Sequence, residues 1–289
     1  MITSEQQAQA QTLLALHTSG ELLVLPNVWD VIGARVLEKT GYPAIATASA
    51  AIAESLGYAD GENIRLETML EILFRISRSV RVPVTADIEA GYAETIDALQ
   101  ENIVQVIQTG VVGINIEDSL AGHSALRSIK AQCERIAAIR QVANTHGVHL
   151  VINARVDSFI SSGLDSKQEK IEQAILRAQA YVEAGADCIY PIGPGDRETL
   201  GILRERITAP LNVLASPKAL GLAELQRLGI NRVSFGPHIF RSCLAKFVGV
   251  TEELKKFGNY ESFAQYSLSG ADVSNFLISG KEQEVYGGS

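Results

Sequence analysis

The sequence predicts an α/β protein folded as a (β/α)8 TIM-type barrel with extra C-terminal helices. Three observations predict this fold. Eight short runs rich in β-branched residues alternate with longer segments of helical periodicity. No GxGxxG motif follows the first run, where an open doubly wound sheet, the main alternative, would usually bind a dinucleotide. The chain has 289 residues, enough for one barrel and an extension.

Each strand and helix is predicted from its local pattern. The expected strands cover residues 22–26, 44–48, 82–89, 112–118, 149–157, 187–192, 211–215 and 232–236. Several of these runs are apolar at both odd and even positions, which is typical of parallel strands covered on both faces. Apolar residues at helical spacing predict helices over 64–79 and 124–145. Residues 1–289 are therefore expected to form a single barrel domain, with 251–289 as a C-terminal helical extension and tail.

Composition excludes several functional classes. The formal net charge is −8, and no stretch combines Lys and Arg with aromatic residues, so no nucleic-acid partner is expected. No apolar run is long enough to span a membrane. The first residues lack the basic and then apolar pattern of a secretory signal, and the three cysteines show no disulfide or metal-binding spacing. We therefore expect a cytoplasmic location.

Acidic side chains gather where the predicted strands end, which is the active-site face of a barrel. Asp60 follows the second strand, Asp87 and Glu89 end the third, and Glu117 ends the fourth. Alternation along an extended strand would place Asp87 and Glu89 on the same side. Desolvated carboxylates repel one another, and a hard divalent cation relieves that repulsion. Because Mg²⁺ usually takes only one or two protein carboxylates, we expect one direct ligand, with the other acids holding metal-bound water. Mn²⁺ is a possible substitute.

Two charged residues near these strand ends allow more than one interpretation. Arg155 could bind a substrate carboxylate in bidentate fashion, or it could form a salt bridge with Asp157 or with the acidic cluster. Asp30 precedes a helical pattern and is expected to cap that helix.

Six stretches of the chain carry a family resemblance. They are LPNVWDVIGARVLEKTGYPAIATASAA, LGYADGE, PVTADIEAGYA, GINIEDS, NARVDSF and RVSFGPHIFR. With them, the sequence resembles the isocitrate lyase/phosphoenolpyruvate mutase superfamily over nearly all of residues 20–250. The pairing of PVTADIEAGY with a following INIED is the most specific part of the resemblance.

The resemblance implies a Mg²⁺-dependent barrel enzyme that makes or breaks a C–C or P–C bond beside a pyruvate-like enolate. It also implies a homotetramer in which a C-terminal helix is exchanged between subunits. Asp87 would be the direct metal ligand, while Asp60, Glu89 and Glu117 would hold metal-bound water. The expected substrate-binding residues, at the ends of the second, fifth and seventh strands, are Thr47, Ser49, Ala50, Ala51, Arg155 and Asn212. The expected catalytic residues are Arg155, Glu117 and His123.

The loop after the fourth strand departs from the family pattern. Isocitrate and methylisocitrate lyases carry a Lys-Lys/Arg-Cys-Gly-His segment there, whereas IEDSLAGHSAL keeps only Gly122 and His123. The Lys and Asn of the mutase and phosphonopyruvate hydrolase loop are also absent between Ser119 and Ser128. The leading hypothesis is a C–C lyase or decarboxylase acting on a small 2-oxo or 2-hydroxy (di)carboxylic acid. P–C bond chemistry and non-catalytic binding of 2-oxo acids are the alternatives.

Overall fold

The computed structural model describes residues 2–120 and 125–277, and it confirms the barrel. All strand pairs are parallel, and every predicted strand contains an observed one. The strands are β1 (Leu23–Leu25), β2 (Asn27–Val28), β3 (Ile45–Thr47), β4 (Val84–Asp87), β5 (Gly113–Glu117), β6 (Val151–Val156), β7 (Cys188–Pro191), β8 (Asn212–Leu214) and β9 (Arg232–Ser234).

The barrel closes where the first predicted strand ends at Pro26, because a further short strand, β2, follows directly and pairs on the other side. Strands β2 to β7 form one six-stranded sheet, and β1, β9 and β8 form a second sheet in that order. An isolated bridge between Ile189 and Leu211 joins the sheets on one side. On the other side, Pro26 has no N–H to donate to a neighbouring strand, so β1 pairs with β9 and β2 pairs with β3. The side chain of Asn27 accepts hydrogen bonds from the N–H groups of Phe235 and Gly236, which fixes this seam.

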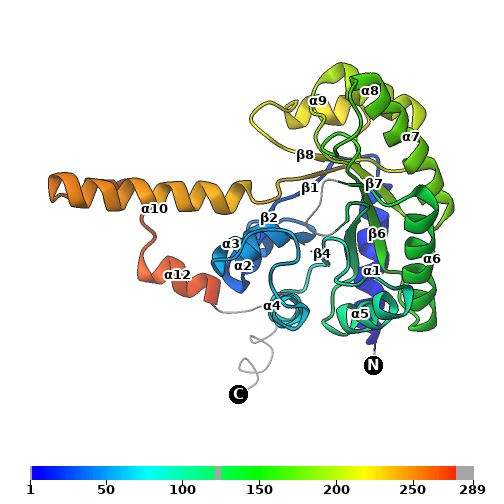
Figure 1. The fold of residues 1–289 in the computed structure, drawn as a ribbon. Helices are drawn as coiled ribbons and strands as arrows, with labels where there is room; N and C mark the ends of the chain where they lie inside the picture. Colours follow the sequence, from blue (N-terminus) through cyan, green and yellow to red (C-terminus); the bar gives the residue numbers. More distant parts are fainter. Residues whose placement is uncertain (1, 121–124, 278–289) are drawn as a thin grey trace.

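A ring of helices covers the outside of the barrel (Figure 1). These helices are α2 (Val31–Lys39), α3 (Ser49–Ser55), α4 (Leu66–Ser79), α5 (Ile96–Gln108), α6 (Ile129–Thr145), α7 (Lys167–Glu183), α8 (Arg197–Arg206) and α9 (Leu222–Arg227). Asp30 caps α2 as predicted, accepting a hydrogen bond from the Gly33 N–H at 2.8 Å. The helix expected over 124–145 begins later, at Ile129, because the Ser128 hydroxyl caps it by accepting from the Ala131 N–H.

Helix α1 (Ser4–His17) was not predicted, and it lies against the amino-terminal end of the barrel. The side-chain amide of Gln6 donates to the carbonyl oxygens of Ile107 and Val111, just before β5. The buried face of α1 consists of Gln6, Ala10, Leu13 and His17. Since two of these four residues are polar, the helix has no continuous apolar stripe to reveal it in the sequence.

The first of the C-terminal helices extends away from the barrel, and the last one returns to contact α2. Helix α10 (His238–Phe257) projects as a long arm, and α11 (Glu261–Tyr266) and α12 (Gly270–Leu277) follow it (Figure 1). At the base of the arm, Phe240 packs edge-on against Trp29, with ring centroids 5.1 Å apart, and Arg241 pairs with Glu54. The expected boundary at residue 251 falls inside α10. Within the described residues, no helix is both long enough and apolar enough to cross a membrane.

Candidate active site

The carboxyl ends of β3 to β7 bring most of the predicted site residues to one mouth of the barrel. Strand register places Asp87 beside Asn115, Glu117 beside Arg155, and Arg155 beside Tyr190. Asp60 joins them from the connection between α3 and α4, since its pKa responds to Asp87 and Arg155. The sequence therefore placed the acidic residues correctly at one end of the barrel.

Asp87 is held by residues of β3 and α3. The Asp87 N–H donates to the Thr47 hydroxyl at 3.0 Å, while a carboxylate oxygen of Asp87 accepts from the Ser49 hydroxyl at 2.8 Å and from its N–H at 3.1 Å. Thr47 is fully buried, so in this structure it positions Asp87. Asn212 is also fully buried; its amide nitrogen donates to Ser234, and its carbonyl oxygen has no protein partner.

The conformation of Glu89 differs from the sequence expectation. Strand β4 ends at Asp87, and Glu89 adopts a left-handed backbone with φ +52°, so strand alternation does not set its direction. Glu62 and Tyr92 also have positive φ, at 59° and 55°, and they are the other non-glycine residues in the described chain that do. Such conformations cost roughly 1–3 kcal/mol each and cluster at functional sites.

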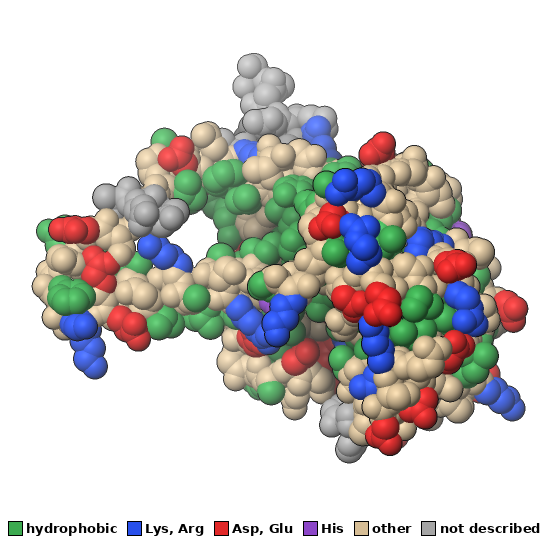
Figure 2. All heavy atoms as spheres, turned by 90° about the horizontal axis from the view of Figure 1, so that it is seen from above, with side chains coloured by type: hydrophobic (Ala, Val, Ile, Leu, Met, Phe, Trp, Pro, Cys, Tyr) green, Lys and Arg blue, Asp and Glu red, His purple; other side chains and the backbone are tan. Residues whose placement is uncertain are grey.

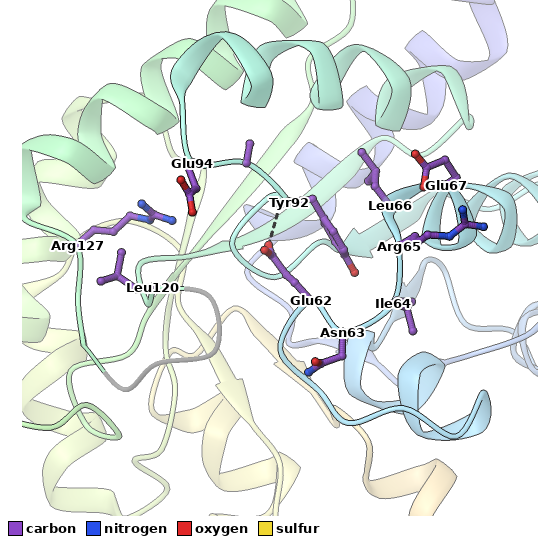
Figure 3. Close-up of a pocket in the computed structure, with 11 residues that line it drawn as sticks. Glu62, Asn63, Ile64, Arg65, Leu66, Glu67, Tyr92, Glu94, Leu120 and Arg127 are labelled. Carbon is purple, nitrogen blue, oxygen red and sulfur yellow. Dashed lines mark hydrogen bonds between the residues drawn. The ribbon is translucent and has the colours of Figure 1, made fainter.

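Glu62, Glu89 and Tyr92 are joined to one another by hydrogen bonds. The Glu62 N–H donates to the Glu89 carboxylate at 2.6 Å, and the Tyr92 hydroxyl donates to the other Glu89 oxygen at 3.2 Å. The Glu62 carboxylate in turn accepts from the Tyr92 N–H at 2.7 Å, the dashed line in Figure 3. The closed set of bonds offsets the backbone strain and fixes the carboxylate of Glu89.

The acidic side chains raise one another's pKa. Burial, with the charges of Asp87 and Asp60, raises the pKa of Glu89 to about 7. Burial and Asp87 also raise the pKa of Asp60. Burial raises the pKa of Glu117 well above its usual range, and this outweighs the opposing effect of Arg155. Without a cation, these buried carboxyl groups therefore hold a proton more strongly than exposed carboxyl groups do.

This donor set fits a hard divalent cation, because carboxylate oxygens crowded at one mouth are relieved by such an ion. Within residues 2–120 and 125–277, no three Asp, Glu, His or Cys side chains are arranged to bind one metal ion together.

Arg155 forms the salt bridges that the sequence allowed as one of its two roles. One of its terminal nitrogens lies 2.6 Å from Glu117, and its Nε lies 2.7 Å from Asp157. Burial would lower the pKa of Arg155, but Glu117 and Asp157 raise it above its usual range. A guanidinium has five N–H groups, and the bonds to these two carboxylates use three of them, so two remain for a substrate.

The remaining predicted site residues are Ala50, Ala51 and His123. Ala50 and Ala51 are buried in the first turn of α3, where backbone N–H groups lack helical partners. His123 lies outside the described residues.

Three residues that the sequence did not single out also belong to the site, namely Glu62, Tyr92 and Tyr190. Tyr190 is buried beside Arg155, and burial raises its pKa to about 12. In the sequence, the one feature that could have indicated a role for Tyr190 is its position near the end of a predicted strand.

The fold and the site together define the class of protein. It is a (β/α)8 barrel with acidic groups and an arginine at the carboxyl ends of its strands, where enzymes of this fold have their active sites. Residues 13–255 match the family model described as Phosphoenolpyruvate phosphomutase. The chain belongs to this family.

Named relatives include two kinds of lyase. The chain is 30% identical to a 2-methylisocitrate lyase of Aeropyrum pernix over 252 residues, which cover 82% of this chain and 77% of that protein. It is 29% identical to an oxaloacetate decarboxylase of Pseudomonas putida over 230 residues, 76% of each chain. A solved structure from Burkholderia cenocepacia superposes with a TM-score of 0.88 at 30% identity, covering 96% of this chain and 98% of that one. These relatives support lyase or mutase activity at the level of the superfamily.

Proposed function

We propose that this protein is a Mg²⁺-dependent lyase that cleaves a C–C bond of a small 2-oxo or 2-hydroxy dicarboxylic acid through an enolate, in the simplest case as a decarboxylase. The observation that carries the proposal is the combination of the acidic cluster and Arg155 with a following loop, 119–128, that contains no thiol or amine. Decarboxylation needs an electron sink but no thiol acid, so it suits this site.

Each site residue has a specific role in this proposal. Asp87 would bind the metal directly, and Asp60, Glu89 and Glu117 would hold its water. When bound, Mg²⁺, or Mn²⁺ in its place, supplies positive charge that stabilises the developing enolate oxygen.

The substrate would be held by Arg155 and by the first turn of α3. The two remaining N–H groups of Arg155 would bind the substrate carboxylate. The backbone N–H groups of Ala50 and Ala51, with the hydroxyl of Ser49, would orient the carboxylate and keto oxygen. Asn212 has a buried carbonyl oxygen without a protein partner, which favours a polar contact near this position.

A substrate panel tests the proposal. Purified protein with Mg²⁺ would be incubated with oxaloacetate and other 2-oxo acids, 2-hydroxy diacids, methylisocitrate and phosphonopyruvate. We expect CO₂ or a 2-oxo acid fragment to be released from at least one diacid, with activity lost when EDTA removes the metal. Release of phosphate from phosphonopyruvate would instead support P–C chemistry. Binding of 2-oxo acids without turnover of any compound would support a non-catalytic binder.

A further inference from the structure

A cavity of about 890 Å³ lies beside the acidic cluster. Its walls come from the connections after β3, β4 and β5, so three neighbouring strand-end loops meet around it (Figure 3). It shares Glu62 and Tyr92 with the hydrogen-bonded set that fixes Glu89. The cavity is therefore distinct from the acidic cluster but connected to it.

Arg127 presents to this cavity a guanidinium group that forms no ion pair within the described residues. Figure 3 shows its guanidinium pointing in from the loop that precedes α6. The Nε of Arg127 is buried without a hydrogen-bond partner, and no carboxylate of the described chain lies within ion-pair distance of its guanidinium. By contrast, the nearby Arg155 and Arg177 each pair with a carboxylate. Arg127 is partly buried, and a guanidinium group at a cavity wall without a carboxylate partner favours an anionic ligand.

A buried arginine, Arg135, adds a second positive charge close to Arg127. Arg135 is only 2% exposed, donates to the carbonyl oxygen of Ala90, and has two further nitrogens, Nε and Nη1, with no partner. Burial and the neighbouring charge of Arg127 lower the pKa of Arg135 to about 10. Glu62 partly offsets this repulsion between the two guanidinium groups, and an anion bound beside Arg127 would reduce it further.

The carboxylates that line the cavity form no ion pair with Arg127 in the described chain, although the charge of Arg127 partly opposes the burial that raises the pKa of Glu62. Glu62 is occupied by the Tyr92 N–H, and Figure 3 shows Glu67 pointing to the far side of the cavity. Glu94 faces Arg127 from the opposite wall, but it is exposed and forms no ion pair with it. A ligand carboxylate would therefore meet an arginine whose donors are available.

We propose that this cavity is a binding site for a carboxylate anion, with Arg127 as the residue that pairs with it. The anion is either the distal carboxylate of a dicarboxylic substrate or a separate small carboxylic acid, and only the first source rests on the proposed function. In both cases, the shared residues Glu62 and Tyr92 would couple the cavity to Glu89.

Arg127→Met is the variant that tests this site. It removes the guanidinium but keeps the two backbone contacts of residue 127, its N–H to Asp118 and its carbonyl oxygen to Arg177. Arg65→Met is the matched control, because Arg65 lines the same cavity but its side chain points away in Figure 3. Arg127→Lys should restore part of the binding, since it keeps the charge. Equal melting temperatures would show that all variants fold alike.

Calorimetry with Mg²⁺ present would compare three probes, 2-oxobutyrate, 2-oxoglutarate and succinate. If the substrate supplies the carboxylate, Arg127→Met weakens 2-oxoglutarate binding roughly tenfold or more, the effect of losing a charge-assisted hydrogen bond, while 2-oxobutyrate binding changes less than about twofold. If a separate acid supplies the carboxylate, the wild type binds succinate and 2-oxobutyrate at the same time. Arg127→Met then loses succinate binding and keeps 2-oxobutyrate binding.

Two results would overturn the inference, namely wild-type affinity of Arg127→Met for all three probes, or a wild type that binds neither dicarboxylate. The proposed function can fail separately from this site. Succinate binding that depends on Arg127, in a protein that turns over no compound of the substrate panel, would reject the lyase and keep the anion site.

Discussion

Arg232 extends across the interior of the barrel with no exposed surface and no carboxylate within ion-pair distance in the described chain. It donates to the side-chain oxygen of Asn115 on the opposite wall, which also accepts from Asn153. At the amino-terminal end, one guanidinium nitrogen lies 3.4 Å from Nε2 of His17. Burial and the charge of Arg232 lower the pKa of His17 to about 4, so this histidine is neutral in the folded protein.

The neutral state of His17 predicts a pH-dependent stability. In the unfolded chain His17 takes up a proton below its usual pKa of 6.5, whereas the folded protein does not until pH falls to about 4. Stability is therefore full above pH 6.5 and decreases as pH falls towards 4, by about 3 kcal/mol from this residue. Urea unfolding across this range should show the loss, and His17→Gln should lack it. An identical pH slope in His17→Gln would refute this assignment.

Asp87 gives a second prediction at this scale, about the metal. Asp87→Ala should lose Mg²⁺ binding and Mg²⁺-dependent activity, because it removes the proposed direct ligand while Asp60, Glu89 and Glu117 remain. Titration calorimetry measures this loss, and Asp97→Ala, an exposed acid in the first turn of α5, serves as the control. If Asp87→Ala bound Mg²⁺ as tightly as the wild type, the metal assignment would be wrong.

The connection between β5 and α6 is the element that separates this chain from the lyases it resembles. Its ends are fixed, because Ser119 and Leu126 form an antiparallel bridge and the Arg127 N–H donates to the Asp118 carbonyl. The Ser119 hydroxyl also donates to Asp157, the acid that holds Arg155. The loop is therefore tied directly to the arginine of the site.

His123 provides the test for this loop. It lies outside the described residues, but in the sequence it is the one side chain between Ser119 and Ser128 that can exchange a proton near neutral pH, since Arg127 stays permanently charged. If the protein is a C–C lyase or decarboxylase, His123→Ala should lower kcat by more than about tenfold. Arg155→Ala should be inactive. Unchanged kcat in His123→Ala, with Arg155→Ala inactive, would restrict the chemistry to the metal site and the arginine.

At the scale of the whole molecule, the C-terminal arm is the feature that a single barrel does not explain. No residue of α10 is buried, and large apolar side chains stay exposed along it, including Phe247 and Phe257 at 65% each. Figure 2 shows these hydrophobic groups along the arm and where it meets the body of the molecule. An exposed apolar surface of this kind normally marks an interface.

We therefore propose a homo-oligomer, a tetramer by family resemblance, in which the arm packs against a second copy. Light scattering at micromolar concentration should give a mass several times that of one chain. Replacing both Phe247 and Phe257 with Ser should shift that mass towards the monomer, whereas Phe74→Ser, an exposed aromatic on α4, should not. A monomeric wild type would contradict the proposal. The cytoplasmic location and the absence of a nucleic-acid partner stay predictions.

The sequence alone was enough to predict where the strands lie, because strands follow from local patterns of residues. The positions of the acidic residues relative to the strands followed from that prediction. The sequence determined that Asp87 and Glu117 end their strands, that Asp60 and Glu89 follow a strand, and that Asp30 caps a helix. Tertiary structure decided what depends on contacts between distant segments. Only the fold shows that Thr47 and Ser49 hold Asp87, that Glu62 and Tyr92 hold Glu89 in a left-handed conformation, and that Arg127 faces a cavity without a partner. Partners of this kind are far apart along the chain or depend on a backbone bend, so residue spacing alone could not reveal them.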